Sequence, residues 1–201
     1  MKIKAIAAIA QKEKAIKLCN TEDTQWVLLK GAAYPLYGLP ELDPETLPVV
    51  MDIPEHKSDK MLISWDNKPD ELCFDDVCDG ERELPPPQLV SIGYGGQVMY
   101  PEITSKGLVF YDPEYLKPLD GEFALYERVT KSGQIYLAAK TGFMLKAIIM
   151  PIAVNTTDMA ARLSSLLYAL QTESGVIRTT ENMDIDLGTG EVVEGRYYNG
   201  R

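Results

Sequence analysis

Apolar residues recur with two different periods along the chain, and these periods predict its secondary structure. Ile3, Ile6, Ile9 and Ala10 recur at helical spacing on one side, which predicts a helix over residues 3–11. Further along, short apolar runs alternate with polar turns, a pattern typical of strands. In the first half these runs predict strands at residues 15–19, 25–29, 32–39 and 61–65.

The strand pattern continues through the second half and then gives way to a helix. It predicts turns at residues 93–96 and 131–133 and strands at residues 88–92, 97–100, 107–111, 122–129, 134–140 and 145–152. Leucines at helical spacing predict a helix that begins at the cap Asn155–Thr157 and ends near Thr172. A last hairpin is predicted over Asp184–Val193, followed by a frayed end at Tyr197–Arg201.

One short motif, Asp-Pro-Glu-x-Leu, occurs twice, at Asp43–Leu47 and at Asp112–Leu116. Each copy follows a Tyr-Pro pair and precedes an alternating apolar run. Aspartate caps free N–H groups and proline suits the first helical position, so each copy should open a short helical turn. The repeated order predicts a single α+β domain of duplicated strand–helix–strand units with antiparallel sheets. Its two related halves would be residues 1–84 and 88–153, with a C-terminal extension at residues 154–201.

Charge is distributed unevenly along the chain. The net charge of −10 argues against indiscriminate coating of nucleic acid, yet the first 18 residues hold five lysines and one glutamate. Residues 70–83 hold seven carboxylates and one arginine, and three prolines follow, so this stretch is the best linker candidate. No apolar run approaches the length of a membrane helix, and the run at residues 5–10 is too short for a signal core.

Motifs that carry chemistry are scarce. His56 lies in a strongly polar segment, where exposure is favoured over a catalytic role. Gly93-x-Gly-Gly96 lacks the third glycine of a dinucleotide fingerprint, and a turn is the favoured interpretation. Cys73 and Cys78 flank acidic residues, but structural zinc needs further soft ligands, so a solvated loop is favoured over a metal site. We therefore expect no enzymatic activity, no cofactor and no bound metal. The odd cysteine count favours reduced thiols and a cytoplasmic location.

Three segments together resemble the last unit of bacterial DNA polymerase sliding clamps. They are Leu108–Leu119, the hairpin at Ile135–Ala139 and the run Ala147–Ile152, within residues 107–152. In that family a helix start with phenylalanine and Tyr-Leu precedes a hairpin and a closing strand that ends in Met-Pro. The resemblance implies duplicated units with helices on one face and sheets on the other. Ala153-Val154 stands here where the family has Arg-Leu.

The resemblance also implies roles for particular residues. Closing-strand residues of clamps help to form a pocket for partner peptides, which assigns partner binding to Met150, Pro151 and Ile152. A clamp should gather basic residues on its helix-bearing face, which makes the DNA-facing candidates Lys2, Lys12, Lys14 and Lys17.

The main hypothesis is thus a non-catalytic cytoplasmic scaffold or interaction protein that resembles a sliding-clamp domain, in DNA replication or in the DNA handling of a mobile element. A protein partner is expected, DNA and further copies of the chain are additional candidates, and no membrane is involved. One alternative is an acidic DNA mimic or regulator that binds a basic protein through residues 70–83. A second alternative is a hydrolase that uses carboxylates.

Overall fold

The computed structural model describes residues 1–86, 91–94, 96–154, 157–161, 164, 165, 168, 183–185 and 192–194. These residues belong to two units, Met1–Ala153 and Val154–Arg201. No helix among them is long and apolar enough to cross a membrane.

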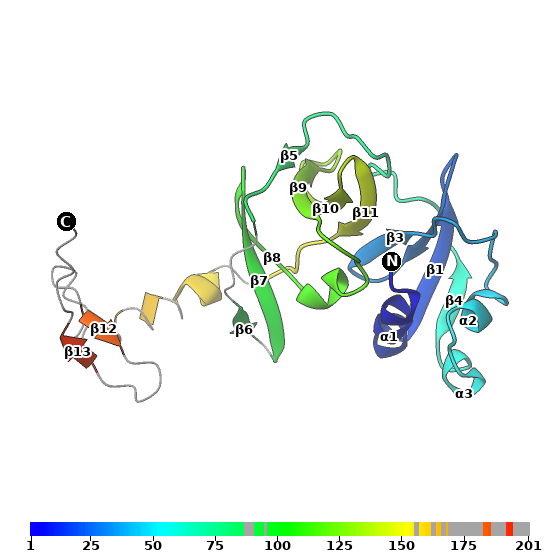
Figure 1. Cartoon of the computed structure of the whole chain (residues 1–201), viewed down its shortest axis with the longest axis horizontal. Helices are drawn as coiled ribbons and strands as arrows, with labels where there is room; N and C mark the ends of the chain where they lie inside the picture. The colour runs from blue at the N-terminus through cyan, green and yellow to red at the C-terminus, as the bar shows by residue number, and fades with distance from the viewer. Residues whose placement is uncertain are drawn as a thin grey trace, which may run out of the picture. The chain divides into compact units, whose positions relative to one another are not determined.

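The first unit is built on a sheet of eight strands (Figure 1). In sheet order these are β4 (Leu62–Trp65), β1 (Ala15–Asn20), β2 (Gln25–Leu28), β3 (Ala32–Pro35), β11 (Met144–Ile149), β10 (Ile135–Thr141), β9 (Ala124–Val129) and β5 (Arg82–Glu83). Strand β4 runs parallel to β1, whereas all other neighbours are antiparallel. The sheet is therefore mixed, which corrects the prediction of purely antiparallel sheets.

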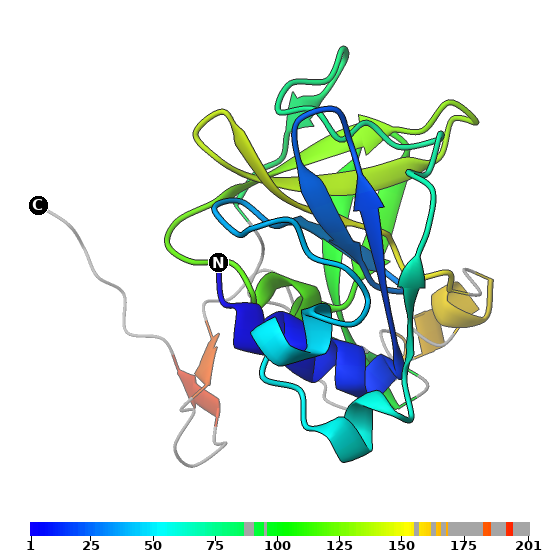
Figure 2. The same ribbon diagram turned by 90° about the vertical axis from the view of Figure 1, so that its right-hand side faces the viewer.

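Two three-stranded meanders, β1–β2–β3 and β9–β10–β11, meet in the middle of this sheet. Their last strands pair with each other, with Ala33 opposite Ile148. A helical element precedes each meander, α1 (Ile3–Glu13) before β1 and the 3-10 helix η1 (Pro113–Leu116) before β9. The two helical elements are joined by a hydrogen bond of 2.6 Å from the Tyr115 hydroxyl to Glu13, and they lie side by side in Figure 2.

Alternation along the strands divides the core between the two faces of the sheet. On β10, Leu137 and Ala139 belong to the cluster on the α1 face, whereas Tyr136 and Ala138 belong to the cluster on the opposite face. The buried stripe of α1, which includes the fully buried Ile6, packs into the first cluster. The helical period of the sequence thus places α1 on the sheet, as predicted.

The remaining elements of the first unit are short. They are the helices α2 (Leu47–Val50) and α3 (Glu55–Ser58) and a small antiparallel sheet of β6 (Ile92–Tyr94), β7 (Gln97–Thr104) and β8 (Gly107–Tyr111). The predicted strand at residues 88–92 lies mostly outside the described residues, and β6 contains its last residue. His56 lies on α3 and is exposed, in agreement with its polar surroundings.

In the second unit, residues 157–161, 164, 165 and 168 are helical and lie within the helix predicted for residues 155–172. The cap at Asn155 and Thr156, the end of this helix and the tail at Tyr197–Arg201 lie outside the described residues. Strands β12 (Met183–Ile185) and β13 (Val192–Glu194) pair antiparallel, with Asp184 opposite Val193, and confirm the predicted hairpin.

Both Asp-Pro-Glu segments form capped turns, as predicted. Asp43 accepts hydrogen bonds from the N–H groups of Glu45 and Thr46, and Asp112 accepts one from Glu114. Their places in the topology differ, however, because Asp43 follows the first meander and Asp112 precedes the second. The two aspartates therefore do not occupy equivalent positions in the topology. The repeated motif had predicted that they would.

Candidate partner-binding site

The acidic stretch at residues 70–83, predicted to be a linker, is folded onto the face of the sheet opposite α1. Its Phe74 packs edge-on against Trp26 of β2, with ring centroids 4.9 Å apart. The Cys73 N–H donates to the Tyr136 hydroxyl, and the Leu145 N–H donates to Asp76. The linker interpretation is wrong, because aromatic packing fixes this segment, which we call the acidic loop, to the first meander and hydrogen bonds fix it to the second.

Arg128 of β9 holds the acidic loop from beneath. Its guanidinium is fully buried and donates to the backbone carbonyls of Cys73, Asp75 and Asp76 at 2.9–3.1 Å. It also forms an ion pair with Glu81 at 2.6 Å. Five fixed donors suit guanidinium to such a set of acceptors, so a single buried charge satisfies several carbonyls that a loop would otherwise leave unpaired.

Glu81 balances two buried cations. Besides Arg128, it accepts a hydrogen bond from Lys140, whose side chain is only 3% exposed. Burial alone would raise the pKa of Glu81, but the hydrogen bonds from Lys140 and Arg128 outweigh it and hold this pKa below the usual 4.5. Glu81 is therefore ionised at neutral pH and neutralises part of the charge beneath the acidic loop.

An apolar cavity of about 450 Å³ opens on this same face, beside the acidic loop. Strand residues Leu28, Ala33 and Ile148 contribute to its walls, together with Leu72 from the loop and Met150 just after β11. Side chains of the second core cluster continue directly into these walls. Apolar cavities of this volume are typical of ligand and peptide sites.

The rim of the cavity is polar and carries both charges. Lys17 of β1 donates to Asp66 at 2.7 Å, and this hydrogen bond lowers the pKa of Asp66. Hydrogen bonds from Ser132 likewise lower the pKa of Glu71, which accepts from the Ser132 N–H at 2.8 Å. An apolar floor inside a charged rim is the arrangement found at the centre of protein interfaces.

Of the three residues predicted to bind a partner, only Met150 lines the cavity. Its N–H donates to the carbonyl of Gly31, which places it against the β2–β3 turn. The N–H of Ile152 donates to Phe110 of β8, and Pro151 lies between the two. The chain thus leaves the main sheet at Met150, and the cavity is formed at that point.

The four lysines predicted to face DNA do not lie on one face. Lys2, Lys12 and Lys14 lie on or beside α1, but Lys17 lies on the opposite side of the sheet, at the rim of the apolar cavity. Lys2 is paired with Asp120, and Lys17 is paired with Asp66. Lys12 and Lys14 are the two of the four without an ion pair among the described residues.

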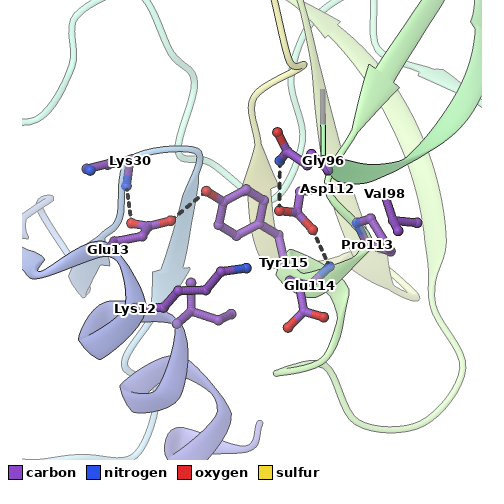
Figure 3. A pocket seen from close by; sticks show the side chains of 11 residues that line it. Lys12, Glu13, Lys30, Gly96, Val98, Asp112, Pro113, Glu114 and Tyr115 are labelled. Carbon is purple, nitrogen blue, oxygen red and sulfur yellow. Dashed lines mark hydrogen bonds between the residues drawn. The ribbon is translucent and has the colours of Figure 1, made fainter. Parts of the chain in front are cut away.

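A second cavity, of about 550 Å³, lies between α1, η1 and the β6–β7 turn (Figure 3). Its carboxylates are occupied by internal donors. Glu13 accepts from the Lys30 N–H and the Tyr115 hydroxyl, and Asp112 accepts from the Gln97 amide. Burial and the bond to Glu13 raise the pKa of Tyr115, so this hydroxyl stays protonated. These groups join the two helical elements, and we assign the cavity a structural role.

No group of histidine, cysteine and carboxylate side chains within the described residues could hold a metal ion. The other wall residues of the apolar cavity, such as Leu28 and Leu72, were not identified from the sequence. Leu28 and Leu72 are distant from Met150 in the sequence, and each lies in an ordinary strand or loop pattern. The Met-Pro pair at the end of a predicted strand was the sequence signal that indicated a partner site here.

Comparisons with known proteins find no match: no protein-family model matches the chain, nor does any curated protein or solved structure.

Proposed function

We propose that this protein is a non-catalytic interaction protein that binds an apolar segment of a partner protein in the cavity beside Met150. The observation that carries the proposal is the apolar wall beside Ile148, where Leu28, Leu72 and Met150 continue the core but are only partly covered by the described residues. Burying an apolar anchor side chain of a partner against such a wall contributes about 1.5–3 kcal/mol per residue.

The ion pairs at the rim favour a peptide over a wholly apolar small ligand. Lys17 and Asp66 offer one cation and one anion at the same edge, so a backbone or side chain of either charge finds a complement there. Charged groups at the rim of an interface contribute to specificity and association rate more than to affinity. The partner segment would thus carry one or two large apolar residues flanked by polar ones.

A clamp-like scaffold remains the preferred broader form of this proposal. Two features support it: α1 and η1 lie on one face of the main sheet, and each precedes an antiparallel meander. The division into two related halves is part of the same proposal, and it now rests on the two helix–meander units, since Asp43 and Asp112 occupy different places in the topology. A role in DNA replication or mobile-element DNA handling rests on the resemblance, and with two of four candidate lysines paired internally, DNA contact would depend on Lys12 and Lys14.

The two alternatives find less support. In the acidic loop, Glu71, Asp76, Glu81 and Glu83 accept internal hydrogen bonds, so these carboxylates are not arranged for a basic partner. A carboxylate-dependent hydrolase would need convergent free carboxylates, whereas Glu13 and Asp112 in the second cavity each accept two internal donors.

The proposal is tested by selecting from a random heptapeptide display library on the immobilised full chain and measuring the affinities of the recovered peptides. We expect peptides rich in leucine, phenylalanine or methionine, whose dissociation constants rise at least tenfold with Met150→Glu. Met144→Glu is the matched control, because Met144 begins β11, which ends just before Met150, but is 44% exposed and outside the cavity. Failure to recover any peptide, or affinities that Met150→Glu leaves unchanged, would contradict the proposal.

A further inference from the structure

The open edge of the main sheet at β4 has the features of an interface rather than of a protected edge. Strand β4 pairs only with β1 among the described residues. Leu62 is 58% exposed and Trp65 is 46% exposed. Native edge strands are usually blocked by proline, by charge within the strand or by a bulge, and Leu62–Trp65 contains neither proline nor charge.

Hydrogen bonding determines which backbone groups of β4 are available. The N–H groups of Leu62 and Asp66 donate to Lys14 and Leu18 on the β1 side. Because successive residues of a strand direct their backbone groups to opposite sides, Ile63 and Trp65 direct theirs to the open edge. In an antiparallel partner strand, the residues whose backbone groups point toward β4 must therefore lie opposite Ile63 and Trp65.

We propose that β4 pairs antiparallel with β4 of a second copy of this chain, around a two-fold axis at Ile63. In this register Ile63 faces Ile63 of the second copy, and Met61 faces Trp65. The N–H of Ile63 and that of Trp65 each gain an acceptor across the axis. Met61 contributes only its carbonyl, because its N–H already donates to Ser58.

Charge selects this register over its neighbours. Lys60 falls opposite Asp66 of the second copy on both sides of the axis, a cross-strand pair of opposite sign. A shift of one two-residue step in one direction places Lys60 opposite Lys68 and Leu62 opposite Asp66, whereas the shift in the other direction leaves Lys60 opposite Ser64. Only the proposed register places opposite charges across from each other at both ends.

The surroundings of Lys60 supply a second reason for a facing carboxylate. Lys14, Lys57 and Lys60 line one hollow of about 260 Å³ at the start of β4, where their like charges repel. Asp66, at the other end of β4, reaches this hollow of the second copy in the antiparallel arrangement. The exposed apolar groups are also covered, since Leu62 meets Leu62 of the second copy diagonally and Trp65 covers Met61.

This contact is isologous, so it yields a closed dimer and not a chain of subunits. The contact involves one short strand from each copy, so we expect a weak dimer that forms only at high protein concentration. The two-fold contact and the Met150 cavity share Asp66, which pairs with Lys17 at the cavity rim, but dimerisation needs no ligand in the cavity.

Sedimentation velocity of the full chain from 5 to 500 µM tests the proposal. We expect the mass to rise from 22.4 kDa to twice that value and no further. Lys60→Glu should weaken dimerisation at least tenfold, because it places a carboxylate opposite Asp66 of the second copy on both sides of the axis. Lys131→Glu, the same charge change on a distant exposed turn, is the matched control and should leave the dimer intact.

Trp65→Pro provides a second variant that does not depend on charge. It removes an outward N–H and the indole but no backbone group that bonds to β1, so the monomer keeps its β1 ladder, while the dimer loses two hydrogen bonds and the contacts of Trp65 with Met61. A protein that is monomeric at 500 µM would overturn the proposal. So would a dimer that tolerates both Lys60→Glu and Trp65→Pro, or masses that continue to rise beyond the dimer and thereby indicate head-to-tail pairing.

Discussion

The two faces of the main sheet are covered by different means. On one face, the helix α1 packs an apolar stripe, with Ile6 fully buried, against residues of both meanders. On the other face, the acidic loop is held by Arg128, Glu81 and Lys140, and its Phe74 packs against Trp26. The helix covers its face mainly by hydrophobic burial, with the hydrogen bonds of Glu13 at its end, whereas the loop depends on a few buried charges.

This difference accounts for the position of the partner site. A helix satisfies its own backbone groups and can lie over apolar residues continuously, but an irregular loop must find a partner for each polar group. The acidic loop covers only the part of the sheet where Arg128 and Tyr136 can form hydrogen bonds with its backbone. Beyond it, Leu28, Ile148 and Met150 remain at the wall of an open cavity.

The largest effect is expected from Glu81→Gln, which removes the anion of the loop-covered face. Arg128 and Lys140 would stay buried without a counter-charge, so unfolding in urea at pH 7 should show a loss of about 3–5 kcal/mol. Glu83→Gln is the control, since Glu83 is exposed and accepts only from the Tyr126 hydroxyl; it should cost less than about 1 kcal/mol. Equal losses in the two variants would contradict this view of the loop.

The same carboxylate sets a dependence on pH. Because the pKa of Glu81 is lower in the folded state than its usual 4.5, its contribution is complete above about pH 4.5 and is lost as the pH falls through the folded-state value. The difference in stability between the native chain and Glu81→Gln should therefore shrink in acid.

A smaller effect is expected on the helix-covered face from Gly31→Ala. A methyl group at Gly31 would lie 2.7 Å from the Tyr115 ring, which joins η1 to α1. Displacing this ring should cost about 1–3 kcal/mol in thermal or urea unfolding. Gly93→Ala serves as the control, because nothing lies within 4 Å of its added methyl group. If Gly31→Ala causes no loss of stability, the present position of the Tyr115 ring does not contribute to the stability of the fold.

The smallest effect is expected from Glu102→Gln on β7, and it has the opposite sign. Glu102 is buried, its Oε2 atom lacks a hydrogen-bond partner, and burial raises its pKa above 4.5. Its contribution is therefore complete below pH 4.5 and is lost as the pH rises through the folded-state value. At pH 7 the variant should be more stable by about 1 kcal/mol, with no gain at pH 4. A loss at pH 7 would mean that the carboxylate is stabilising.

Local features of the fold could be predicted from the sequence. The helical spacing of Ile3, Ile6 and Ile9 indicated α1, and aspartate before proline indicated the capped turns at Asp43 and Asp112. These signals are local because they depend on neighbours within four residues. The parallel pairing of β4 and the junction of β3 with β11 join distant segments, and no local pattern specifies them.

The acidic loop shows most clearly why part of the site was missed. Its composition is that of a linker, and Arg128 sits in a strand where an alternating pattern would place a solvated residue. Only the tertiary structure brings a guanidinium beneath three carbonyls of the loop. Met150 could be identified because a family resemblance marked the end of its strand, whereas Leu28 and Leu72 had no such mark.

The most direct test of the partner site is methyl NMR of the full chain with all eight methionines labelled at the methyl carbon. A selected apolar heptapeptide is titrated in, and the methionines are assigned by single substitution. We expect the Met150 signal to shift in a saturable manner, while the signals of Met99, buried in the small sheet, and Met144, exposed outside the cavity, stay unchanged. Saturable binding that leaves Met150 unshifted would contradict the assignment of this cavity as the partner site.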